Sequence, residues 1–304
     1  MANAKEIKRK IGSIKNTWKI TKAMELISTV KMKKAQDLAM EKRNFVLEML
    51  KIFLRVEDYL SEFPLFWENS NWTKTLAVVI TSNKWLCWGY NVNVMKKVNS
   101  YIKETGEDLD FVSIWKKASN FVAKTWNNLI ADFSDDFTDD LDPVFTRKIS
   151  ELLREEYLTW KYNKVVVFYN FYVNTIKQIP VAKTSFPIDS DDIKKYLVSV
   201  LEDHFDVESE INEMENTYSY DIEPSPEELV NDVMPIILDM MFFDTLLNAK
   251  ASEHSARMIA MKNAKDSANK IAWALTLKYN KARQASITSE VSEITAWVES
   301  MKDA

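Results

Sequence analysis

The sequence predicts an α/β fold with long helical arms: an antiparallel coiled coil of the N- and C-terminal helices, plus a central Rossmann-like α/β domain. Helical periodicity runs along both ends of the chain with few breaks, whereas the middle alternates strand-like apolar runs with shorter helical patterns. Glycine, which long helices exclude, occurs only three times in 304 residues. We expect an N-terminal helix over 1–60, an α/β domain over 74–205, an acidic connection over 206–224, and a C-terminal helix over 225–304 that pairs with 1–60.

The first sixty residues are predicted to be helical throughout. Asn3 can cap the helix, and no proline occurs before Pro64. Apolar residues recur at helical spacing, beginning with Ile7, Ile11 and Ile14. A helix of about 57 residues would be roughly 85 Å long. Such a length favours a coiled coil or a shaft over an ordinary globular helix.

The C-terminal helix has a clear start signal at Ser225-Pro226-Glu227-Glu228, with Ser225 as the cap and Pro226 in the first turn. The helical pattern then continues almost to the terminus, although Pro235 should bend it early. About 75 residues in one helix give roughly 110 Å. Two helices of this length at opposite ends of one chain are best buried against each other.

The middle of the chain is predicted to form a largely parallel sheet. Its strands alternate with helices, which is typical of an α/β domain. The predicted strands cover 75–81, 110–114, 164–169 and 176–186, and the predicted helices cover 91–104, 116–125 and 143–158.

Composition limits the possible functions. The formal net charge of -5 argues against a general nucleic-acid binder. Cys87 is the single cysteine, so no internal disulfide can form and a reducing compartment is expected. The chain opens without a signal-peptide pattern, and its most apolar run, 233–247, contains two aspartates and is too short to span a bilayer. We therefore expect a soluble, cytoplasmic protein.

Signals for an active site are weak. The sequence lacks a phosphate-binding G-x-x-x-x-G-K-[ST] motif, and His204 and His254 are its only histidines. His254 follows Glu253, but a helix-surface or interface histidine is favoured over acid–base catalysis. Six acids fall within 132–142 without the spacing of a calcium loop, so a solvated loop is favoured over a metal site. We predict no catalytic residue, no metal and no cofactor.

The N-terminal helix is strongly basic in an acidic protein. The segment from Lys5 to Arg43 contains 12 basic and four acidic residues, a net charge of +8. This field suits an acidic partner surface, although a merely solvated helix face is about equally favoured. Aromatic residues are not interleaved with the basic ones, so nucleic acid is disfavoured.

Three blocks of the sequence stand out: residues 5–37 (KEIKRKIGSIKNTWKITKAMELISTVKMKKAQD), residues 81–93 (TSNKWLCWGYNVN), and residues 223–298, which end on ASITSEVSEITAWV. In this order, they resemble the N-terminal helix, the first strand-to-helix turn and the C-terminal helix of gamma subunits of F-type (H⁺-transporting) ATP synthases. The order of these elements agrees along the whole chain.

The resemblance implies a non-catalytic rotor in the central stalk. It implies an antiparallel helix pair inside a ring of alpha and beta subunits, and an α/β foot that meets the epsilon subunit and the membrane c-ring. Proton-driven rotation would then be coupled to ATP synthesis or hydrolysis in the beta subunits. The complex would lie at the cytoplasmic face of the inner membrane. The positions carried over as rotor–stator contacts are Lys22, Ala23, Met24, Arg257, Gln284, Thr288 and Glu290.

Tryptophan replaces glycine at several places in this resemblance. Six tryptophans coincide with family glycines or with turns that tolerate glycine: Trp85, Trp88, Trp115, Trp126, Trp160 and Trp297. Glycine serves where φ is positive or backbones approach closely, and an indole does neither. We interpret these positions, with Trp18 and Trp273 as further candidates, as glycine encoded by UGA and written as tryptophan. Real tryptophans in repacked turns are the alternative.

Two other classes of protein stay open. An α/β small-molecule enzyme with helical arms would need a glycine-bearing turn and polar groups at the carboxyl ends of its strands, and 81–91 is the only candidate turn. A self-associating coiled-coil scaffold would need long sustained heptads, whereas the apolar stripes here drift and include Thr21 and Lys265.

Overall fold

The computed structural model of the chain describes residues 2–41, 43–68, 74–125, 128–134, 141–201, 223 and 225–302. The chain divides into two compact units, Met1–Thr29 with Arg257–Ala304, and Val30–Ala256. Two long helices, α1 (Ala2–Glu41) and α8 (Pro226–Lys302), contribute residues to both units. Nearly all of the predicted acidic connection over 206–224, His204, Trp126 and four of the six clustered aspartates lie outside the described residues.

The larger unit is built on a five-stranded sheet. Its order is β3-β2-β1-β4-β5, where β1, β2, β3 and β4 run parallel and β5 pairs antiparallel with β4. Apolar residues fill β1 and β4 on both faces, as expected for central strands. The strands are β1 (Lys74–Ile80), β2 (Asp108–Ile114), β3 (Asn128–Phe133), β4 (Lys164–Tyr172) and β5 (Gln178–Phe186).

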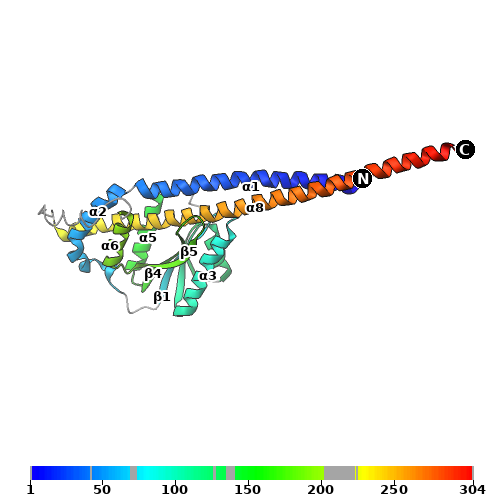
Figure 1. The fold of residues 1–304 in the computed structure, drawn as a ribbon. Helices are drawn as coiled ribbons and strands as arrows, with labels where there is room; N and C mark the ends of the chain where they lie inside the picture. Colours follow the sequence, from blue (N-terminus) through cyan, green and yellow to red (C-terminus); the bar gives the residue numbers. More distant parts are fainter. Residues whose placement is uncertain are drawn as a thin grey trace. The chain divides into compact units, whose positions relative to one another are not determined.

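Helices cover both faces of this sheet. On one face, Val94 of α3 and Val122 of α4 share a core with Val79 and Phe111. The opposite face packs a larger core with four helices, α2, α5, α6 and the first part of α8. Figure 1 shows the sheet and these helices. The helices are α2 (Arg43–Val56), α3 (Trp88–Thr105), α4 (Lys116–Thr125), α5 (Pro143–Leu158) and α6 (Ser190–Leu201), and the short 3₁₀ helices η1 (Glu57–Glu62) and η2 (Pro64–Phe66) follow α2.

The smaller unit consists of the N-terminal part of α1 and the C-terminal part of α8. The two segments lie side by side with opposite chain directions (Figure 1). Glu25 and Lys265 form an ion pair of 2.6 Å between them. The buried residues of this unit are small or polar as well as apolar. The hydroxyls of Thr21 and Ser28 donate to carbonyls of their own helix, and Ala268 is 6% exposed. The predicted antiparallel helix pair is therefore confirmed in this unit.

Most predicted elements are confirmed, with two corrections. The single N-terminal helix is divided, because α1 ends at Glu41 and α2 begins at Arg43 in a different direction (Figure 1). Val46, Leu50 and Phe53 of α2 are fully or almost fully buried in the core of the α/β unit, which holds α2 there. Strand β3 was not predicted, because its exposed and half-exposed residues alternate over only six positions. No helix of the described residues is long and apolar enough to cross a membrane.

Candidate functional site

The first group of predicted contact residues lies on α1 in the smaller unit. Lys22 and Ala23 are exposed and Met24 is half-buried. The Lys22 ammonium lies 5.0 Å from the centre of the Trp18 ring, one turn earlier on the same helix. Lys22 and Ala23 are therefore available to a partner surface, whereas Met24 is only partly so.

The second group lies on α8. Gln284, Thr288 and Glu290 are exposed. Thr288 Oγ1 donates to the Gln284 carbonyl at 3.0 Å, and Glu290 accepts a hydrogen bond from Ser286 at 3.2 Å. These bonds stay within the helix and leave the outer faces of the side chains open. Arg257 differs from the others because it is only 6% exposed, which makes it the weakest candidate for contact with another chain.

An exposed apolar stripe runs along the last turns of α8, and the sequence analysis missed it. The stripe comprises Ile287, Val291, Ile294, Val298 and Met301, each between 43% and 61% exposed. The steps of four, three, four and three residues place all five on one face of the helix. In the smaller unit, α8 continues beyond the N-terminal end of α1 (Figure 1), so α1 does not cover this stripe. Heptad spacing was the signal that could have found it.

The candidate enzyme turn at 81–91 is held together by a buried network of hydrogen bonds between its own residues. The Ser82 backbone N–H donates to Asn91 Oδ1 at 2.9 Å, and Asn91 Nδ2 donates to Ser82 Oγ at 2.8 Å. The Cys87 thiol donates to Ser82 Oγ at 3.2 Å. All three side chains are at most 8% exposed. The polar groups at the carboxyl end of β1 therefore hold the turn together and are not presented to a substrate.

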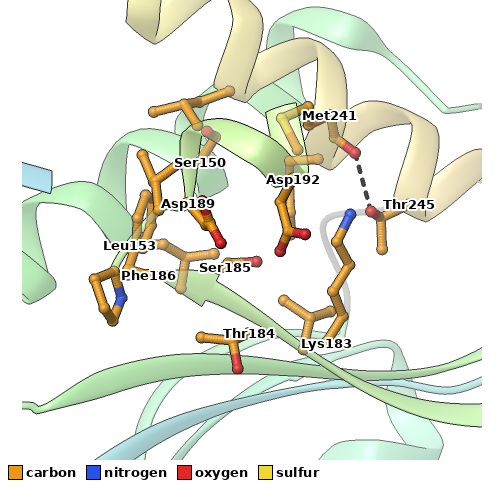
Figure 2. A pocket seen from close by; sticks show the side chains of 15 residues that line it. Ser150, Leu153, Lys183, Thr184, Ser185, Phe186, Asp189, Asp192, Met241 and Thr245 are labelled. Carbon is orange, nitrogen blue, oxygen red and sulfur yellow. Dashed lines mark hydrogen bonds between the residues drawn. The ribbon is translucent and has the colours of Figure 1, made fainter. Parts of the chain in front are cut away.

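A pocket of about 690 Å³ lies in the larger unit. Its lining includes Lys183 on β5, Asp192 and Tyr196 on α6, and Asp244 on α8, and Tyr196 donates a hydrogen bond to the Asp244 carboxylate. Burial lowers the pKa of Lys183, and the neighbouring Asp192 only partly opposes this effect. Figure 2 shows Lys183 in the adjoining small pocket, where its amine points toward Asp192 and Thr245. The sequence analysis did not identify this cluster.

Two residues considered for chemistry, Asp132 and His254, lie in the described part of the larger unit. Asp132 accepts hydrogen bonds from Ser113 at 2.6 Å and from Ser119 at 2.7 Å. Burial acts to raise the pKa of Asp132, but these bonds outweigh it and lower the pKa. His254 is buried at 4% exposure, so of the two expected positions the helix surface is wrong, and an interface position agrees with this burial. Across the described ranges, no group of three or more His, Cys, Asp or Glu residues could hold a metal ion.

Fold and surface together define the class of protein: an α/β domain with two very long terminal helices, on which most of the candidate functional residues are exposed. The profile of the family described as "ATP synthase" matches residues 3–301. The chain is 31% identical over 304 residues to the ATP synthase gamma chain of Akkermansia muciniphila, covering 99% of this chain and 100% of that one. It is 33% identical over 307 residues to the gamma chain of Halothermothrix orenii, with 99% and 100% covered.

Solved structures show the same fold. A chain of the Euglena gracilis mitochondrial ATP synthase, in a structure of OSCP, F1 and c-ring, superposes with a TM-score of 0.63 at 16% identity, covering 99% of this chain and 95% of that chain. A rotor chain of the same organism's enzyme gives a TM-score of 0.58 at 15% identity, with 94% and 99% covered. The chain belongs to the ATP synthase gamma chain family. Gamma chains are non-catalytic subunits of the central stalk in a membrane-associated complex.

Proposed function

We propose that this chain is the central-stalk rotor that couples ion-driven rotation of the membrane ring to ATP synthesis or hydrolysis in the catalytic head. Its helices would contact the alpha and beta subunits, and its α/β domain would contact the epsilon subunit and the c-ring. The exposed apolar stripe on α8 is the observation that carries the proposal, because an uncovered heptad face of this length calls for a partner. We place the complex at the cytoplasmic face of the inner membrane.

We further propose Lys22, Ala23, Met24, Gln284, Thr288 and Glu290 as rotor–stator contacts. Their exposed or half-exposed positions in the smaller unit support this role. A shaft that turns inside its housing needs many weak contacts and no single strong one. The short polar side chains and small residues of 281–289 suit such a surface. Arg257 is proposed with them on its resemblance to the family alone.

Reconstitution tests the proposal. The isolated chain should hydrolyse no ATP, whereas stoichiometric addition to alpha and beta subunits should produce an active head. ATP hydrolysis by the isolated chain would refute the rotor function. Self-association without capture of alpha and beta subunits would favour the coiled-coil scaffold.

Substitution of the stripe tests the surface itself. Replacing Ile287, Val291, Ile294 and Val298 together by serine should weaken capture of the chain by alpha and beta subunits at least tenfold. A tenfold loss of affinity corresponds to a loss of about 1.4 kcal/mol of binding free energy. The matched control is Val144→Ser on α5, an apolar residue with 67% exposure outside the helix pair. Equal capture of the two variants would exclude the stripe as a contact surface.

A further inference from the structure

We infer that glycine, and not tryptophan, occupies positions 115 and 160 in the protein that the source cell makes, because its gene uses UGA codons that a glycine tRNA reads. The inference stands on the backbone and the composition of this chain and does not depend on the rotor function. It extends to the other tryptophans at glycine-like turns wherever they share the same codon.

Backbone conformation singles out these two positions. Three non-glycine residues of the described chain have positive φ, and two of them are Trp115 at 69° and Trp160 at 60°. For an L-residue with a Cβ atom, this region costs about 1–2 kcal/mol through contact with the following carbonyl. Glycine does not incur that cost. A bulky aromatic residue is therefore the least expected choice at both places.

A glycine elsewhere in the chain shows what such positions normally hold. Gly106 ends α3 with φ 68°, and its N–H donates to the Ile102 carbonyl at 2.9 Å. Trp160 lies two residues after the end of α5, with the same sign of φ, and its N–H bonds to the Tyr157 carbonyl at 3.1 Å. Helices commonly end on a left-handed residue of this kind, and that residue is usually glycine. Trp160 therefore stands where a helix-ending glycine is expected.

Trp115 occupies a second type of glycine turn. It directly follows β2 and directly precedes α4, and the Ala118 N–H bonds to its carbonyl at 3.1 Å. Packing does not decide between glycine and tryptophan at position 115. The indole is buried, and the Lys250 ammonium lies 4.0 Å from its ring centre. The positive φ favours glycine over tryptophan, because the reversal of the backbone from strand to helix sets this angle.

Composition supports the same reading. A chain of this length with average glycine usage of about 7% would hold about 21 glycines, whereas this one has 3 glycines and 10 tryptophans. Tryptophan is highly buried on average, yet Trp85, Trp273 and Trp297 are 70%, 68% and 66% exposed. Tryptophan is normally encoded by UGG, which differs from UGA in one base. A decoding rule that gives tryptophan to both codons would convert every UGA glycine into a written tryptophan.

Codons and masses test the inference directly. We expect UGA at positions 115 and 160 in the gene, and peptides of the full chain purified from the source cells should carry glycine masses there. Any of the 10 tryptophans encoded by UGG serves as the internal control and should keep its tryptophan mass. UGG at both positions, or tryptophan masses at UGA codons, would overturn the inference.

Expression supplies a second, independent readout. In a host that stops at UGA, the unaltered gene should yield only a truncated chain, and changing each UGA to the glycine codon GGA should restore the full length. A full-length product from the unaltered gene in that host would also overturn the inference. Both results are read from chain length and mass alone, so they do not depend on rotation or on ATP hydrolysis.

Discussion

Breaking an ion pair between α5 and α8 should destabilise the α/β unit, because it leaves a charge uncompensated. Arg154 Nη1 lies 2.5 Å from Asp239 Oδ1, and the two side chains are 11% and 18% exposed. Arg154 also donates to Ser150 Oγ at 2.8 Å, so its guanidinium is held from two helices. Asp239→Ala would leave a mostly buried cation with Ser150 as its remaining partner of these two.

The expected loss can be bounded from both sides. Breaking a fully buried ion pair costs about 3–5 kcal/mol, while a hydrogen bond to a charged group contributes about 1.5–3 kcal/mol. Because both side chains keep some solvent contact, we expect Asp239→Ala to lower the free energy of unfolding by about 2–3 kcal/mol. Arg147 is the matched control, since its Nε lies 3.5 Å from Asp239 Oδ2 but its side chain is 64% exposed. Arg147→Ala should cost less than about 1 kcal/mol.

The assay is urea unfolding of the full chain, followed by circular dichroism and by fluorescence. A double-mutant cycle with Arg154→Met and Asp239→Ala isolates the coupling between the two side chains. A coupling energy below about 0.5 kcal/mol would refute the assignment. So would an equal loss in Arg147→Ala and Asp239→Ala.

Three further predictions concern titrating groups. Burial acts to raise the pKa of Asp110, but hydrogen bonds from Lys74, Asn128 and Tyr162 lower it below 3.8. Asp110→Asn should therefore lower the free energy of unfolding by about 1–3 kcal/mol in urea melts at neutral pH. This deficit should vanish as the pH falls through the pKa of the folded state. Burial lowers the pKa of Lys183 from 10.5, so Lys183→Met should melt at a higher temperature than the parent at neutral pH. The difference in melting temperature should close above pH 10.5, and a difference that does not change with pH would contradict the prediction. The hydrogen bond with Glu25 raises the pKa of Lys265 above 10.5. Glu25→Gln should therefore lower the melting temperature at neutral pH, and this effect should disappear above the raised pKa. Thermal melts at several pH values would test this.

Local pattern was enough to predict most of the fold. Continuous apolar runs mark β1 and β4, and the signal Ser225-Pro226 marks the start of α8, so these elements were predicted closely. The division between α1 and α2 could not be predicted in this way, because the break depends on where α2 finds its core. Strand β3 is a short edge strand whose exposure alternates, which leaves too weak a periodic signal.

The surface residues are harder to predict than the fold. Tyr196 and Asp244 are 48 positions apart and meet only through the packing of α6 against α8, so this polar cluster has no local signature. The resemblance supplied Arg257 as a contact residue, and only the structure shows that it is buried. The apolar stripe on α8 was visible in the spacing from Ile287 to Met301, but only the fold shows that α1 leaves it uncovered.

The ion pair between Glu25 and Lys265 joins residues 240 positions apart, and this separation sets the order in which the chain can fold. At about 5–20 residues per second, synthesis of the intervening segment takes roughly 12–48 seconds. During that time the first helix has been made while its partner has not, so its pairing face is open to solvent and to other chains. The net charge of +8 between Lys5 and Arg43 opposes association of such nascent helices with one another. The same basic residues that suit a partner in the finished molecule can thus protect the unfinished one.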